Sequence, residues 1–141
     1  MGFIKESDKP VIKEMLSEMR SEVTLRYFTQ EIECEFCRET HELLQELSAL
    51  DDKIKLEVFD LTKNADEAGK YKIDKIPATV VGNSRDFGIR FYGIPAGYEF
   101  SSLLEAIVMV SQGESSLSEE SKNFLKELKS PVHLQVFVTP T

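Results

Sequence analysis

An α/β fold with a central mixed sheet flanked by helices is predicted by three features of this 141-residue sequence. First, short apolar runs of strand type alternate with segments that repeat apolar residues every three or four positions, as helices do. Second, two strand-like runs are separated only by the turn residues 82–86, which is the pattern of an antiparallel hairpin. Third, a pair of cysteines stands where one strand gives way to a helix. Strands joined through helices pair in parallel, so the hairpin adds an antiparallel edge.

The first half of the chain predicts a helix, a strand and a second helix. Residues 7–19 form the expected first helix, because Asp8 can cap it and Pro10 fits its opening turn. The run 23–28 is β-branched and aromatic, as is typical of a buried strand. From Phe36 to about residue 50 an apolar stripe predicts a long helix. The stripe consists of Thr40, Leu43, Leu44, Leu47 and Leu50.

The second half continues the alternation, with apolar runs as strands and amphipathic segments as helices. In chain order we expect a strand over 54–59, a short polar helix over 64–71, hairpin strands over 78–81 and 87–92, a helix over 98–110, a further helix over 118–129 and a further strand over 132–138. The helix over 98–110 has its own apolar face, formed by Phe100, Leu103, Leu104, Ile107 and Val108.

Composition indicates a compact protein and excludes several classes. Hydrophobic residues make up 41% and charged residues 30%, which is neither a disordered nor a membrane composition. No run approaches the roughly 20 apolar residues of a membrane span, and the N-terminus has no signal-peptide pattern, so we expect a cytoplasmic protein that does not bind membranes. A net charge of −8 with scattered basic residues argues against nucleic acid as a partner.

Cys34 and Cys37, the only cysteines, form the motif Cys-Glu-Phe-Cys at the predicted strand-to-helix corner. Two cysteines with this spacing at the first turn of a helix bring their sulfurs within bonding distance. The free N–H groups there favour a thiolate, which is the attacking species in disulfide exchange. In a reducing cytosol such a pair is catalytic or metal-binding more often than structural. The motif therefore predicts dithiol–disulfide chemistry.

Two other interpretations of the cysteine pair remain open. Zinc needs about four ligands, and His41 with a carboxylate could complete a set, whereas His133 is far along the chain. In the plainer interpretation, His41 is a partly exposed helix residue and the protein holds no metal. Alternatively, the pair is vestigial and the protein is a structural or docking unit that recruits a partner chain.

A second feature is Pro77, which follows Ile76 at the start of a predicted strand. Taken alone, it is an ordinary strand boundary or a constrained turn. The cysteine motif on its strand-to-helix corner, the segment 70–79 and the hairpin and helix that follow belong together. With these features, the chain resembles the thioredoxin superfamily over roughly residues 23–113. The resemblance implies that Pro77 is cis and packs against the cysteines. It also implies that Ile76 offers backbone groups to an extended substrate.

A closer resemblance comes from the N-terminal helix, the segment 92–100 and the tail. These look like the N-terminal unit of the two-unit, glutaredoxin-like protein disulfide oxidoreductases of thermophilic microbes. The resemblance divides the chain into a thioredoxin-like domain, 1–113, and a helix-strand extension, 114–141, similar to the start of a second unit. It implies a chain that is truncated, or a fragment, ending before a second cysteine pair; the alternative is a self-contained domain with a terminal helix and strand.

The apolar run 132–138 is an aggregation risk if it is a strand without partners. We therefore expect it to add to the first sheet or to pair with another chain, which allows self-association.

The resemblance implies a protein thiol–disulfide oxidoreductase that reduces or exchanges disulfides in cytoplasmic proteins and takes part in cell redox homeostasis. Cys34, nearer the helix start, is expected to be the nucleophile, and Cys37 to resolve the mixed disulfide. Phe36, Ile76 and Pro77 are the expected substrate-binding residues. Phe36 either contacts the substrate or packs at the corner. No cofactor is expected, because the glycines form no dinucleotide fingerprint, so electrons come from a separate reductase or a small thiol.

Two details of the sequence concern how the cysteines ionise. Four carboxylates surround the motif and oppose a thiolate, which favours a reductant, whereas Arg38 acts in the other direction; the four are Glu31, Glu33, Glu35 and Glu39. Thioredoxins keep a buried aspartate where this chain has Phe28. Glu57 could supply a carboxylate instead, although a solvated or salt-bridged Glu57 is the simpler expectation.

Overall fold

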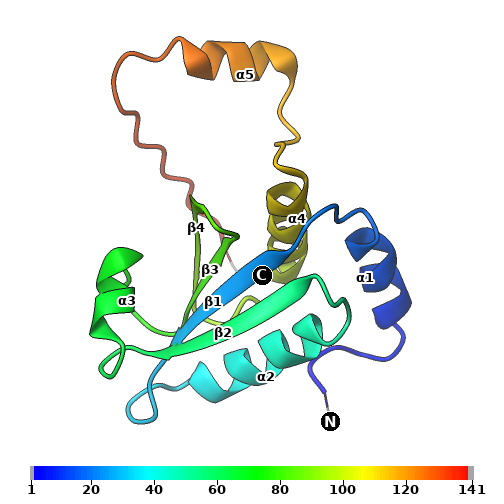
Figure 1. Cartoon of the computed structure of the whole chain (residues 1–141), viewed down its shortest axis with the longest axis vertical. Coiled ribbons are helices and arrows are strands. Elements are labelled where there is room, and N and C mark those ends of the chain that lie inside the picture. The colour runs from blue at the N-terminus through cyan, green and yellow to red at the C-terminus, as the bar shows by residue number, and fades with distance from the viewer. Residues whose placement is uncertain (1, 140–141) are drawn as a thin grey trace.

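The computed structural model describes residues 2–139 and contains one four-stranded mixed sheet (Figure 1). Its strands are β1 (Val23–Thr29), β2 (Ile54–Asp60), β3 (Ala78–Gly82) and β4 (Asp86–Tyr92). The strand order is β2-β1-β3-β4, with β1 parallel to β2 and antiparallel to β3, and with β3 antiparallel to β4. The predicted α/β class and the hairpin edge are confirmed.

Four helices cover the two faces of this sheet in the described part of the chain, namely α1 (Lys9–Leu16), α2 (Cys37–Ser48), α3 (Ala65–Lys70) and α4 (Tyr98–Gln112). A fifth helix, α5 (Glu119–Lys126), follows them in the chain. Helices α1, α2 and α4 pack on one face around a buried core whose members include Leu16, Leu25, Tyr27, Leu44 and Ile107. Helix α3 packs on the other face around a smaller cluster that includes Phe28, Tyr71 and Val80. Alternation along β1 therefore sends Tyr27 and Phe28 to opposite sides of the sheet.

Helix α1 is shorter than the predicted 7–19 helix. Pro10 lies in its opening turn as expected, whereas Asp8 stands at the N-cap position without a side-chain cap hydrogen bond. After Leu16 the chain is held by the Ser111 side chain of α4. Its Oγ accepts from the backbone N–H groups of Arg20 at 2.7 Å and Ser21 at 2.9 Å. These tertiary bonds draw the chain out of the helix before Met19.

The C-terminal part is attached differently. Figure 1 shows α5 held away from the sheet at the end of an extended connection. Ser118 caps α5, with its Oγ accepting from the Ser121 N–H at 3.1 Å, but the helix buries no residue.

The predicted strand over 132–138 is wrong, and so is its addition to the first sheet. Within the described part of the chain these residues have no strand structure, and the sheet consists of β1 to β4 alone. A strand exists only through hydrogen bonds to a neighbouring strand, and alternation of apolar residues does not supply one. Pairing with another chain stays a prediction.

No helix within residues 2–139 is both long enough and apolar enough to cross a membrane.

Candidate functional site

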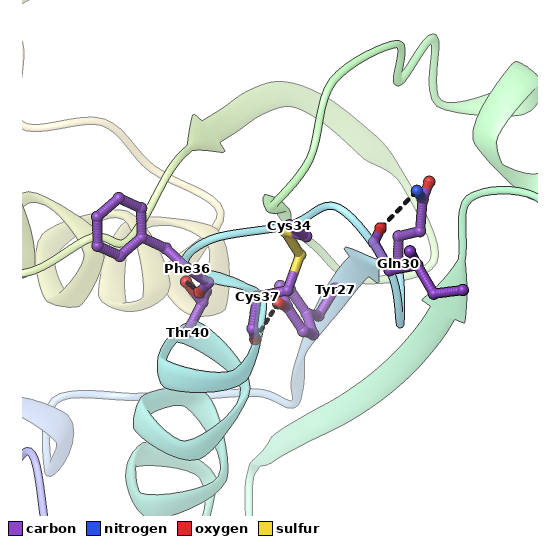
Figure 2. Close-up of a disulfide and its surroundings, with 7 residues drawn as sticks. Tyr27, Gln30, Cys34, Phe36, Cys37 and Thr40 are labelled. Carbon is purple, nitrogen blue, oxygen red and sulfur yellow. Dashed lines mark hydrogen bonds between the residues drawn. A yellow bond between two sulfur atoms is a disulfide. The ribbon is translucent and has the colours of Figure 1, made fainter.

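The candidate site lies where β1 ends and the chain turns into α2 (Figure 2). Strand β1 ends at Thr29, and the loop 30–36 leads to Cys37, the first residue of α2. The Gln30 side chain holds this loop, because its Nε2 donates to the Ile32 carbonyl at 2.7 Å. Glu33 adopts a left-handed φ of 59°, which turns the chain toward Cys34.

Cys34 and Cys37 are joined by a disulfide, with 5.5 Å between their Cα atoms. Cys37 is 4% exposed, whereas Cys34 is only partly buried. Cys34 belongs to the loop rather than to the first turn of the helix, so the sequence placed only Cys37 correctly on α2. The motif thus combines one partly exposed cysteine with one buried cysteine.

Tyr27, on strand β1, anchors the start of α2 to the sheet. Its hydroxyl donates to the Cys37 carbonyl at 2.6 Å, and its side chain is fully buried (Figure 2). Burial raises the pKa of the Tyr27 hydroxyl, and the negative charge of Glu39 adds to the rise. One turn along α2, the Thr40 hydroxyl donates to the Phe36 carbonyl at 2.7 Å. The helix start is therefore anchored by both the sheet and its own first turn.

Sequence reasoning did not single out Tyr27. A signal was present, since alternation along residues 23–28 puts Tyr27 on the same face as Leu25, toward the helix that carries Cys37. His41 lies with its ring 5.7 Å from the Tyr27 ring and is partly exposed, as expected.

Pro77 lies at the same end of the sheet as the cysteines. The Ile76–Pro77 peptide bond is cis, as the thioredoxin resemblance implied. Phe28 pairs with Ala78 in the antiparallel register, so Pro77 comes beside Thr29, where the loop to Cys34 begins. Pro77 is buried and Ile76 partly buried.

Phe36 is 47% exposed. Figure 2 shows Phe36 on the opposite side of the disulfide from Gln30. The fold thus gathers the sequence-predicted site residues at one corner, although Phe36 does not pack into it.

The carboxylates around the motif fall into two groups. Glu31 is paired with Lys63, with 3.0 Å between Oε1 and Nζ. Glu33 and Glu35 are exposed and take part in no ion pair within residues 2–139. Arg38, expected to offset these charges, directs its Nε to Glu42 at 2.9 Å instead.

Glu39 differs from the exposed carboxylates, because its Oε2 is buried without a hydrogen-bond partner among the described residues.

The two positions considered for a buried carboxylate, residues 28 and 57, have other structural roles. Phe28 is fully buried and stacks on Phe59, with ring centroids 5.2 Å apart. Glu57 forms the expected salt bridge, with its Oε2 3.4 Å from the Arg26 Nε, on the face of the sheet away from Tyr27. The Thr79 hydroxyl is buried and has no hydrogen-bond partner in the described part of the chain.

The described residues give the zinc interpretation no ligand set. No group of three or more His, Cys, Asp or Glu side chains within residues 2–139 is placed to hold a metal ion. The disulfide also engages both sulfurs that such a site requires.

The mixed sheet, its flanking helices and the C-x-x-C pair at the start of α2 define a thioredoxin-like fold. Thioredoxin 1 from Thermosipho africanus shares this fold with a TM-score of 0.50 at 16% identity, over 74% of this chain and 99% of that chain.

More similar structures identify the unit further. A protein disulfide oxidoreductase from Aeropyrum pernix matches with a TM-score of 0.79 and 28% identity over 92% of this chain and 56% of that chain. The alkylhydroperoxide reductase AhpF from Enterococcus faecalis matches with a TM-score of 0.81 and 27% identity over 89% of this chain and 61% of that one. Its NTD_N/C domain matches with a TM-score of 0.79. The chain is a thioredoxin-like domain that matches the N-terminal domain of AhpF and an archaeal protein disulfide oxidoreductase.

Sequence comparison gives shorter matches. The alkyl hydroperoxide reductase AhpF of Staphylococcus epidermidis is 41% identical over 54 residues, which are 38% of this chain and 11% of that protein. A Bacillus subtilis NADH dehydrogenase is 24% identical over 99 residues, which are 70% of this chain and 17% of that protein. No family model matches the sequence. The chain therefore spans less than a fifth of these two curated relatives.

Proposed function

We propose that this protein is a thiol–disulfide oxidoreductase that reduces or exchanges disulfides in other proteins, with Cys34 and Cys37 as its catalytic residues. The observation that carries the proposal is the disulfide itself, which joins a partly exposed Cys34 to a buried Cys37 at the start of a helix. The structural relative named a protein disulfide oxidoreductase supports the same chemistry.

The two sulfurs have different roles in the proposed reaction. In the reduced protein, the Cys34 thiolate attacks a substrate disulfide, a mixed disulfide forms, and one substrate thiolate leaves and takes up a proton. Cys37 then loses its proton and attacks the Cys34 sulfur, which releases the second substrate thiol. Two electrons pass to the substrate, and the protein is left with the Cys34–Cys37 disulfide. Burial keeps Cys37 away from bulk solvent, so its reaction is directed to the neighbouring Cys34.

Phe36, Ile76 and Pro77 are the proposed substrate-binding residues. Half-exposed Phe36 offers an apolar contact beside the sulfur. Because the chain at Ile76 and Pro77 leads directly into β3, an extended substrate segment can pair with the Ile76 backbone in the manner of an added strand.

The electrons that regenerate the dithiol come, in this proposal, from a separate reductase or a small thiol. The relatives named alkyl hydroperoxide reductase and NADH dehydrogenase support a reductase as the source. We place the reaction in the cytoplasm, where such a dithiol is kept reduced.

We further propose that residues 1–113 are the catalytic domain and that 114–141 form an extension for contacts between chains. The exposed apolar side chains after α5 support this division.

The reduction potential of the Cys34–Cys37 pair tests the proposal. Alkylation and intact-mass analysis across dithiothreitol buffers should show one two-electron transition, near or below about −250 mV for a reductase and near about −150 mV for an oxidant or isomerase. We expect the lower value, because the uncompensated Glu33 and Glu35 disfavour the thiolate.

Cys34→Ser should abolish insulin reduction, while Cys37→Ser should trap a mixed disulfide. A protein without a two-thiol transition would contradict the proposal and leave the docking interpretation.

A further inference from the structure

The loop that carries Cys34 alternates acidic and apolar residues. From residue 31 to 36 the sequence reads Glu-Ile-Glu-Cys-Glu-Phe. In the structure every member except the partly buried Cys34 is exposed. Cys34 therefore has both acidic and apolar neighbours on the surface. Each of these two kinds of neighbour selects a different property of the substrate.

The acidic members leave an uncompensated negative charge beside the sulfur. Glu33 and Glu35 directly flank Cys34 and have no ion-pair partner in the described part of the chain. Arg38, the nearest basic residue along the sequence, pairs with Glu42, and Lys63 pairs with Glu31. Any substrate disulfide that approaches Cys34 therefore encounters the negative charge of Glu33 and Glu35 at close range.

The apolar members stand on either side of Cys34 along the loop. Ile32 is 72% exposed and Phe36 is 47% exposed. The backbone at each position is held by a hydrogen bond, from the Gln30 side chain to the Ile32 carbonyl and from the Thr40 hydroxyl to the Phe36 carbonyl. Two exposed apolar side chains on either side of Cys34 offer more contact area to a polypeptide than to a small thiol.

We propose that this site selects polypeptide disulfides whose cysteines are flanked by apolar and basic residues, and that it disfavours small anionic disulfides such as glutathione disulfide. The inference rests on the proposed function and names its substrate class. Ile32 and Phe36 bind the apolar flank, and Glu33 and Glu35 attract the basic flank. In each reaction the reduced protein's dithiol supplies two electrons, the substrate disulfide becomes two thiols, and Cys34 becomes bonded to Cys37.

The test compares three oxidised probes. Two are synthetic peptides with the same disulfide loop and a leucine beside each cysteine, one carrying lysines and the other glutamates in the flanks; the third is glutathione disulfide. Pre-reduced full-length protein is mixed with each probe, quenched with an alkylating agent and analysed by intact mass. The rate constants are measured in low salt and in about 1 M salt, where the Debye length falls to about 3 Å.

In low salt the lysine peptide should react about tenfold faster than the glutamate peptide, at the low end of the known range for electrostatic steering. Glutathione disulfide should be the slowest of the three. The preference for lysine should collapse in high salt and in the Glu33→Gln/Glu35→Gln variant. A change in the Cys34 pKa speeds or slows both peptides alike, so the ratio of rates reports the steering alone.

Matched variants separate the contribution of the acidic residues from that of the apolar residues. Glu114→Gln/Glu120→Gln removes the same charge from two exposed glutamates, on the α4–α5 connection and on α5, that form no ion pair within residues 2–139, and it should keep the preference. Ile32→Ser should slow both peptides alike and leave glutathione disulfide unaffected. Equal rates for the two peptides in low salt would overturn the inference while the proposed function stands. Failure of all three probes to oxidise the dithiol would overturn the proposed function instead.

Discussion

Tyr27 links the central sheet to the reactive corner. It is fully buried on the face of β1 that α2 covers, and its hydroxyl reaches the carbonyl of Cys37. The next residue, Phe28, turns to the other face and stacks on Phe59. Phe28 therefore stabilises the sheet, while Tyr27 holds Cys37, the residue that forms the disulfide with Cys34.

Replacing Tyr27 with Phe should lower the free energy of unfolding by about 1 kcal/mol, the usual net contribution of one buried hydrogen bond. The ring keeps its packing, so the loss reports the bond to the Cys37 carbonyl. Urea denaturation of the oxidised protein measures it. Tyr98→Phe is the matched control, because Tyr98 is 83% exposed and should change stability little. Equal effects of the two substitutions would show that the bond to Cys37 does not stabilise the fold.

At the scale of single residues, the sequence predicted the Cys34–Cys37 disulfide better than the contacts that surround it. The spacing of Cys34 and Cys37 is a covalent property, and it predicts a possible disulfide without knowledge of the fold. The partners of a side chain depend on tertiary packing instead. Neither the pairing of Arg38 with Glu42 nor the orphaned Oε2 of Glu39 could be predicted from spacing alone.

The outer hairpin strand β4 has its own electrostatic clamp. Asp86 accepts from the Gly88 N–H at 2.9 Å and from both Nη atoms of Arg90, at 2.8 Å and 2.6 Å. Arg90 also donates to the Tyr71 carbonyl, which ties the hairpin to the segment after α3. Hydrogen bonds from the Arg90 side chain, together with the smaller effect of the Gly88 N–H, lower the pKa of Asp86 from 3.8 to about 2.

The clamp predicts a pH-dependent contribution to stability. Because the pKa of Asp86 is lower in the folded protein, its contribution is fully present above the ordinary value of 3.8 and is lost as the pH falls through about 2. The pair is partly exposed and screened, so Asp86→Asn should cost about 1 kcal/mol or less at neutral pH. Urea unfolding at several pH values checks this, with Asp52→Asn as an exposed control. A cost that persists unchanged at acidic pH would contradict the assignment to the carboxylate.

Elements were predictable where their apolar pattern meets a partner within the same chain. The stripe on α2 and the inward face of α4 both pack into the core as expected. Helix α1 ended early, because its last turn competes with backbone bonds to Ser111 that lie far along the sequence. The run 132–138 shows the opposite case, since its pattern is strand-like and no neighbouring strand is present to pair with it in the described part of the chain.

The molecule as a whole has one well-packed part and one apolar segment that nothing covers within residues 2–139. Five side chains of the tail are between 61% and 90% exposed, namely Val132, Leu134, Val136, Phe137 and Val138. No backbone hydrogen bond involves residues 131–138 within the described part of the chain. Each such side chain gains about 1.5–3 kcal/mol on full burial, so the tail has a strong tendency to associate. Unpaired backbone groups add a template for strand pairing.

We expect the protein to self-associate through this tail in a concentration-dependent way. Sedimentation velocity over a dilution series should show a monomer that converts to a larger species as the concentration rises. Val136→Lys should weaken the association at least about tenfold, because one charged side chain at the interface costs more than the burial of one valine gains. Val11→Lys is the control, since Val11 is also exposed, at 60%, but lies on α1 and adds the same charge. A wild-type protein that remains monomeric at every concentration, or equal effects of the two lysines, would exclude the tail as the interface.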